Sequence, residues 1–139
     1  MNSGFVADAS VVMAWVVESQ SSQATENLLA AAERGAPVHV PVLWTFEVAN
    51  TLLILKRRRR IDQQGYDQAR FDVRGLRPLL DEEGPHLALS SISELAEKYG
   101  LSAYDAVYLE LALRRAIPLA SRDAALNRAA KRIGVRTLL

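Results

Sequence analysis

Short apolar runs alternate along this chain with longer segments in which apolar residues recur every three or four positions. This alternation is typical of an α/β domain, in which each short run forms a buried strand and each longer segment forms a helix. The sequence therefore predicts a central, mostly parallel sheet of about five short strands flanked by helices. The expected strands span residues 4–7, 38–40, 86–89, 118–120 and 135–138.

Helical periodicity predicts seven helices around those strands. Gly35 and Pro37 mark the end of one helix, and Asp62 is placed to cap the start of another. No repeat, low-complexity tract or linker interrupts the pattern, and 139 residues that are half apolar suffice for one core. We therefore expect a single domain over residues 1–139. The expected helices span residues 10–17, 23–34, 42–59, 62–80, 90–99, 102–115 and 124–133.

The composition excludes several kinds of site. The chain has no cysteine, which excludes disulfides, thiolate catalysis and thiolate zinc sites. His39 and His86 fall on separate expected strands, and we interpret both as ordinary strand residues. The longest early apolar run, residues 11–17, is far shorter than the ~20 residues of a membrane span and follows no basic leader. We expect a cytoplasmic protein with no signal peptide and no membrane segment.

Positive charge is concentrated in one place. The formal net charge is only +1, which by itself indicates no polyanionic partner. Five cations are nevertheless consecutive where the long helix expected over residues 42–59 ends, namely Lys56, Arg57, Arg58, Arg59 and Arg60. Cations at that position complement the helix dipole, and they could also bind RNA phosphates without choosing a sequence. The two interpretations are compatible, and both stay open.

Acidic residues follow two of the expected strands. Asp8 comes directly after residues 4–7, and Asp123 lies shortly after residues 118–120. In open α/β sheets, ligands bind outside the carboxyl ends of the strands, where loops and helix N-termini converge. Aspartate is also a favoured helix N-cap, so capping alone would explain either residue.

Glu47 has a more unusual setting. It is the only charged side chain within residues 42–55, an otherwise nearly apolar helix that we expect to be buried on most sides. A buried carboxylate is costly unless a cation or hydrogen-bond donors compensate it. Asn50 and Thr51 lie one turn further on the same face. The alternative is that Glu47 lies at the exposed edge of a wide apolar stripe.

A fourth acid completes a pattern. Asp105 lies three residues after Ser102, which favours a capping box, and its first-turn position directs the carboxylate toward the sheet edge. Four carboxylates in one cleft would repel each other strongly. A divalent cation relieves that repulsion, and an all-oxygen site suits magnesium or manganese.

Four groups of residues, in order, resemble the motifs of the PIN-domain nucleases, and within them the VapC-type toxins of bacterial toxin and antitoxin pairs. The resemblance covers almost the whole chain. Each motif alone is weak, but four in order at family-like separations are specific. The matching residues are Val6, Ala7, Asp8, Ala9, Ser10 and Trp15; then Pro41, Leu43, Glu47, Val48, Asn50 and Leu52; then Leu101, Ser102, Tyr104, Asp105, Ala106, Tyr108 and Leu109; and finally Pro118, Leu119, Ala120, Ser121 and Asp123.

The resemblance implies an endoribonuclease toxin that depends on Mg²⁺ or Mn²⁺, forms a homodimer and is neutralised by a cognate VapB-like antitoxin. It implies direct metal binding by Asp8 and Asp105. Serine at position 121 stands where threonine is frequent in the family, and it keeps the hydroxyl. The implied catalytic and metal-binding acids are Asp8, Glu47, Asp105 and Asp123, with Ser10, Asn50 and Ser121 as the residues that support them.

Two other classes stay open. The first is a PIN-fold module that binds RNA or protein with weak or no catalysis, although none of the four acids is missing. The second is a phosphotransfer or nucleotide-binding α/β domain. That class uses a phosphate-binding glycine loop or a pair of N-terminal acids, and the sequence has neither.

Overall fold

The computed structural model describes residues 3–139 and has a four-stranded parallel sheet with the strand order β3-β2-β1-β4. The strands are β1 Phe5–Ala7, β2 Val38–Pro41, β3 Leu79–Asp81 and β4 Leu119–Ala120. The helices are α1 Ala9–Val16, α2 Gln23–Glu33, α3 Val42–Arg57, α4 Gln63–Leu76, α5 Gly84–Leu87, α6 Ser93–Tyr99, α7 Ala103–Arg115 and α8 Ala124–Arg132, with a 3-10 turn η1 at Glu18–Gln20 and a π turn η2 at Ala88–Ile92. The α/β class and the parallel sheet predicted from the sequence are confirmed.

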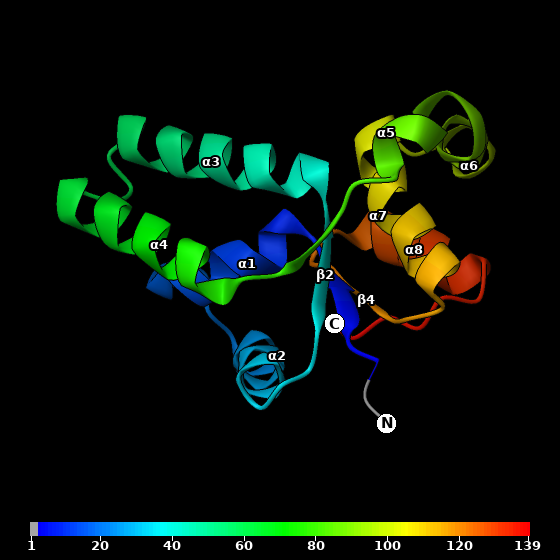
Figure 1. Cartoon of the computed structure of the whole chain (residues 1–139). Coiled ribbons are helices and arrows are strands. Elements are labelled where there is room, and N and C mark those ends of the chain that lie inside the picture. Colours follow the sequence, from blue (N-terminus) through cyan, green and yellow to red (C-terminus); the bar gives the residue numbers. More distant parts are fainter. Residues whose placement is uncertain (1–2) are drawn as a thin grey trace.

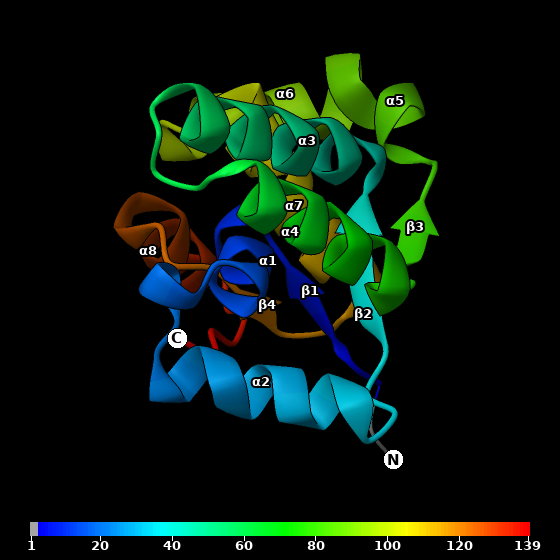
Figure 2. The ribbon, with the colours of Figure 1, turned by 90° about the vertical axis from the view of Figure 1, so that its left-hand side faces the viewer.

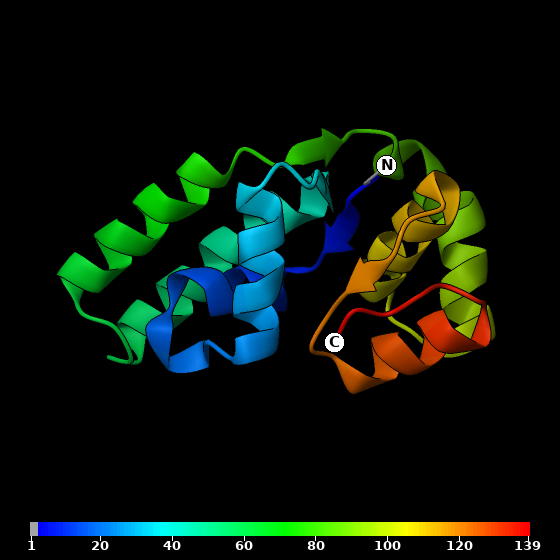
Figure 3. The same ribbon diagram turned by 90° about the horizontal axis from the view of Figure 1, so that it is seen from below.

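Helices cover both faces of the sheet. Figure 1 shows α1 to α4 on one side of the strands and α5 to α8 on the other, and the view from below in Figure 3 gives the same division. Figure 2 shows α3 and α4 running side by side as a helical hairpin, in agreement with their packing contacts. Strands covered on both faces are apolar throughout, which is why β1 has no polar residue.

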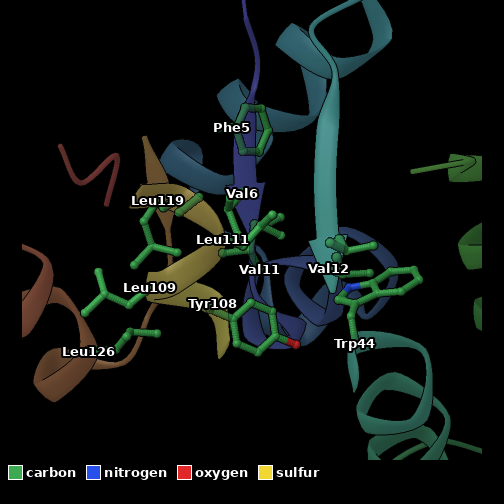
Figure 4. Packing of buried hydrophobic residues seen from close by; sticks show 14 of the residues in the cluster. Phe5, Val6, Val11, Val12, Trp44, Tyr108, Leu109, Leu111, Leu119 and Leu126 are labelled. Atoms are coloured by element: carbon green, nitrogen blue, oxygen red, sulfur yellow. The ribbon is translucent and has the colours of Figure 1, made fainter. Parts of the chain in front are cut away.

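The core lies between these layers. All three residues of β1 are buried, and Figure 4 shows Val6 among Val11, Leu111 and Leu119. The Phe5 ring packs edge-on against Trp15 at 6.3 Å between ring centroids. A glycine is required just before the strand, because Gly4 has a φ of +84° and a Cβ there would lie 2.0 Å from the Pro37 carbonyl oxygen.

The third strand is not where the sequence predicted it. Residues 86–89 form helix rather than strand, because Pro85 opens the short helix α5, and His86 is therefore a helix residue. The strand lies instead at β3, within residues that were expected to continue a helix. That helix ends at Leu76, because Pro78 disfavours the α-helical conformation at Arg77, whose φ is 47°. The prediction that His39 lies on a strand is confirmed.

Other boundaries also shift. Residues 135–138 form only a single bridge, between Leu119 and Thr137, so the fifth expected strand is wrong as a strand. The helix expected from residue 90 begins as the π turn η2 with a kink at Ser90 and becomes regular at Ser93. No helix within residues 3–139 is long and apolar enough to cross a membrane.

Candidate active site

Asp8 lies at the carboxyl end of the central strand β1. Its carboxylate caps α1 by accepting the Val11 N–H at 3.2 Å. The Ser10 hydroxyl donates to one carboxylate oxygen and the Ser121 hydroxyl donates to the other, both at 2.5 Å. Only 7% of Asp8 is exposed. The Asp8 carboxylate therefore caps α1 and is at the same time buried and held by two hydroxyl groups.

Ser121 joins β4 to the site. It is fully buried, its hydroxyl accepts the Asp123 N–H at 3.0 Å, and its carbonyl accepts the Asn127 side-chain amide at 2.9 Å. Asp123 caps α8 by accepting the Leu126 N–H at 2.8 Å and is exposed. The loop after β4 is thus held next to Asp8, since β1 and β4 pair in parallel.

Glu47 is half-buried on α3 and faces α7, where the Tyr108 hydroxyl donates a hydrogen bond to its Oε1. The expectation that its helix is buried on most sides is wrong. Only one stripe of α3, Trp44, Val48 and Leu52, is buried, while Phe46 on the next face is 68% exposed. This stripe lies in the core, Leu43 and Leu55 pack against it while partly exposed, and the helix contacts α1, α4 and β2.

The residues that share a face with Glu47 differ in their contacts. Thr51 donates its hydroxyl to the Glu47 carbonyl at 2.8 Å. The Asn50 side chain is exposed and makes no hydrogen bond to any of residues 3–139. Its supporting role in the site stays a prediction.

Asp105 lies in the first turn of α7. The Ser102 hydroxyl caps this helix and accepts the Asp105 N–H at 3.1 Å, as the sequence spacing predicted. The carboxylate of Asp105 is therefore not needed to explain the cap. It is half-buried and lies within electrostatic range of both Asp8 and Asp123.

The acids influence one another. Burial raises the pKa of Asp8 above its ordinary value of 3.8, although the hydroxyls of Ser10 and Ser121 oppose the shift. Burial also raises the pKa of Glu47, and the charges of Asp8 and Asp105 raise it further. The pKa of Asp105 is raised by burial and then by Asp123 and Asp8. Among residues 3–139, no cation forms an ion pair with any of these four acids.

These carboxylates suit a divalent cation in chemistry and charge. As the side chains stand, no three acidic or histidine groups among the described residues are close enough to hold a metal ion together. Magnesium does not require such a group, because it is commonly held by one or two carboxylates and keeps several waters. The donor set therefore fits an ion bound by two of the acids.

A family model described as the PIN domain matches residues 5–132. The chain belongs to the PIN domain family. Proteins with this domain are generally nucleases, and the family predicted from the four motifs is thereby confirmed. No curated protein matches the chain.

Two solved structures are similar to this PIN domain along most of their length. One is PAE2754 from Pyrobaculum aerophilum, with a TM-score of 0.73, 22% identity and coverage of 99% of this chain and 92% of that one. The other is FitAcB from Neisseria gonorrhoeae, with a TM-score of 0.65, 17% identity and coverage of 96% and 95%. At these identities the likeness establishes the fold.

The PIN domain has another buried acid that the sequence interpretation missed. Asp81 ends β3, is 6% exposed, and accepts two hydrogen bonds at 2.8 Å from the Arg114 guanidinium. Arg114 also contacts Glu110 at 2.7 Å. These bonds lower the pKa of Asp81. The available signal was another strand-end acid, hidden because the strand itself was misplaced.

The five consecutive cations lie at the tip of the α3 and α4 hairpin, far from the sheet in Figure 1. Residues 57–60 are exposed, and Lys56 lies over the Tyr66 ring at 5.0 Å from its centroid. At 1.5 Å of rise per residue, Arg57 is about 15 Å along the helix from Glu47. The tip is thus separate from the acids.

Proposed function

We propose that this PIN domain is an endoribonuclease of the VapC toxin type that uses Mg²⁺ or Mn²⁺. The observation that carries the proposal is a set of four acids, Asp8, Glu47, Asp105 and Asp123, on elements at the carboxyl edge of the sheet, which have no cationic partner within residues 3–139. Burial raises the pKa of Asp8, and burial together with neighbouring acids raises the pKa of Glu47 and of Asp105. Such a set is destabilising unless a cation from outside compensates it.

Each acid has a separate role in this proposal. Asp8 and Asp105 hold the ion, while Glu47 and Asp123 complete the negative cluster and orient water and phosphate groups. Ser10 and Ser121 keep the Asp8 carboxylate in one orientation by donating to its two oxygens. When bound, a divalent cation would lower the pKa of water and neutralise charge that develops on the phosphate oxygens.

The RNA substrate requires cations outside the acidic site. We assign Lys56, Arg57, Arg58, Arg59 and Arg60 to the RNA backbone, because four of them are exposed and make no ion pair within the described residues. An RNA strand lying along α3 could contact both the acids and the tip. Phosphate contacts of this kind give affinity without sequence choice.

Partners follow from the toxin assignment. We propose a homodimer and a VapB-like antitoxin, acting in the cytoplasm. Support comes from large apolar side chains that are exposed, namely Phe46, Phe71, Leu89 and Tyr104. Phe46 and Tyr104 directly precede Glu47 and Asp105 in the sequence, and both line an apolar pocket of about 320 Å³.

The alternative is a PIN-fold module that binds RNA or protein and has little catalytic activity. The exposed apolar residues and the basic tip would serve that function equally well. The four acids would not, because a binding module gains nothing from uncompensated charge.

An RNA-cleavage assay separates the two functions. Purified, antitoxin-free protein is incubated with total RNA, with magnesium or with chelator, and new RNA ends are mapped. We expect ends that require magnesium and disappear in Asp105→Asn, with Asp67→Asn as a control because that acid is exposed on α4 and paired with Arg70. Binding of RNA without new ends, in folded protein with magnesium, would favour the module.

A further inference from the structure

Tyr108 lies between the acids and the core. Only 2% of the residue is exposed, and Figure 4 shows its ring packed near Val11 with the hydroxyl pointing away from α7, toward the side of Trp44. This hydroxyl donates to Glu47 Oε1 from 61 residues further along the chain. The backbone N–H of Ala9, next to Asp8, interacts with the same hydroxyl.

These contacts restrict the hydroxyl to one direction. The hydroxyl donates its proton to Glu47, and the Ala9 N–H lies close enough to the same oxygen to influence the pKa of Tyr108. The buried ring fixes where the oxygen lies, since a packed aromatic side chain has little freedom. Glu47 has the opposite character, because it is half-buried with a long, flexible side chain that loses entropy when it is held.

The Glu47 carboxylate is therefore held at one oxygen only. Oε1 accepts the tyrosine proton, and Oε2 makes no hydrogen bond with residues 3–139. The rigid partner thus anchors one oxygen and leaves the second available to another ligand. Hydrogen bonds of this kind to acids around a metal commonly set both ligand orientation and metal affinity.

We infer that Tyr108 is a positioning residue that holds Glu47 Oε1 so that Oε2 faces the ion or its bound water. The inference rests on the proposed metal-dependent function, and it adds a residue whose role acts entirely through Glu47. Tyr108 touches neither RNA nor the reacting atoms in this arrangement.

The test measures Mn²⁺ binding to the full chain by calorimetry and by the electron paramagnetic resonance of free Mn²⁺. We expect Tyr108→Phe to weaken Mn²⁺ binding about tenfold. Tyr99→Phe is the matched control, because its ring lies against Lys98 and Arg132, away from the acids, and its affinity should equal that of the wild type. A merely structural role would lower the melting temperature without changing Mn²⁺ affinity.

A double-mutant cycle isolates the route through Glu47. In the Glu47→Gln background, Tyr108→Phe should produce no further loss of affinity, because the carboxylate that it positions is gone. Glu47→Asp, which is one methylene too short to keep the contact, should weaken Mn²⁺ binding as Tyr108→Phe does. If Tyr108→Phe does not fold, the Mn²⁺ affinity of Glu47→Asp is measured in its place.

The outcomes separate this inference from the function on which it rests. If the wild type binds Mn²⁺, Asp8→Asn loses it, and Tyr108→Phe or Glu47→Asp binds as the wild type does, the positioning role is wrong and the metal site stands. Additive losses in the double mutant also overturn the route through Glu47. If the wild type binds no Mn²⁺, both the proposed function and this inference fail.

Discussion

Asp8 and Asp81 lie at the carboxyl ends of two strands of the same parallel sheet, and both are more than nine-tenths buried, yet their partners differ. Asp81 is compensated by the Arg114 guanidinium, which lowers its pKa. Among residues 3–139, Asp8 has only hydroxyl and amide donors, and burial raises its pKa. Arg114 thus neutralises Asp81, whereas Asp8 has no cationic partner among residues 3–139.

This difference in partners predicts different roles for the surroundings of Asp8 and the surroundings of Asp81. A carboxylate bound by arginine is satisfied at all times and serves to join β3 to α7. A carboxylate held by neutral donors keeps its negative charge available to a ligand. We therefore expect substitutions at Asp8 to affect chemistry and substitutions around Asp81 to affect stability.

The largest expected effect is on catalysis. Asp8→Asn should reduce RNA cleavage on the order of a thousandfold, because losing a metal ligand removes several kcal/mol of charge stabilisation. Asp81→Asn should leave cleavage by the folded protein near the wild-type rate. Rates of appearance of new RNA ends, with circular dichroism as a fold control, measure both. Full cleavage by well-folded Asp8→Asn would remove the distinction between the regions.

The next effect is on stability. Arg114→Met leaves the carboxylates of Asp81 and Glu110 without their cation, and we expect the free energy of unfolding to fall by about 3 kcal/mol. Arg70→Met, which breaks the exposed pair with Asp67, should cost less than about 1 kcal/mol. Urea unfolding at neutral pH measures both values. Equal losses would mean that burial does not distinguish these two ion pairs.

Acidification should affect the two regions in opposite ways. A folded-state pKa that is raised, as at Asp8, makes the folded protein bind protons more readily than the unfolded chain, so stability falls as the pH rises from 3.8 through the raised value. The lowered pKa of Asp81 contributes stability above 3.8 that is lost as the pH falls through its folded value.

The pH series compares metal-free wild type with Asp8→Asn by urea unfolding. On acidification from neutral pH toward 3.8, the wild type should gain stability relative to the variant. Parallel pH curves for the two proteins would show that the Asp8 carboxylate is not perturbed by its surroundings.

The smallest effect is expected at the basic tip. Replacing Arg57 to Arg60 by glutamine should reduce the salt dependence of RNA binding by about 0.7 in log–log slope for each phosphate that the variant no longer binds. Mn²⁺ affinity should not change, since the tip lies far from the acids. RNA-binding titrations across a salt series provide the measurement. An unchanged slope would mean that these cations do not bind RNA phosphates and only complement the dipole of α3.

Local patterns in the sequence predict the ends of β1 and β4 and the acids that follow them. Asp8, Asp105 and Asp123 were each predicted at a helix start, and all three lie there, because capping is a local property. The strand β3 was missed because three residues carry no usable periodicity, although Pro78 already indicated that the preceding helix must end.

Contacts between distant residues could not be predicted in this way. Ser121 and Asp8 are 113 residues apart, and Tyr108 and Glu47 are 61 apart, so only the paired strands and packed helices bring them together. The partial exposure of α3 could not be predicted for the same reason, because the sequence of an apolar helix does not reveal which of its faces the rest of the protein covers.

The most direct test of the uncompensated acidic site is the effect of a divalent cation on the free energy of unfolding. At a Mg²⁺ or Mn²⁺ concentration 100 times the dissociation constant, we expect the wild type to gain about 2.7 kcal/mol, because the ion binds only the folded state. Asp8→Asn should gain little, whereas Asp81→Asn should gain as much as the wild type. No gain in the wild type at millimolar metal, together with RNA cleavage that is unaltered in chelator, would contradict a metal site at these acids.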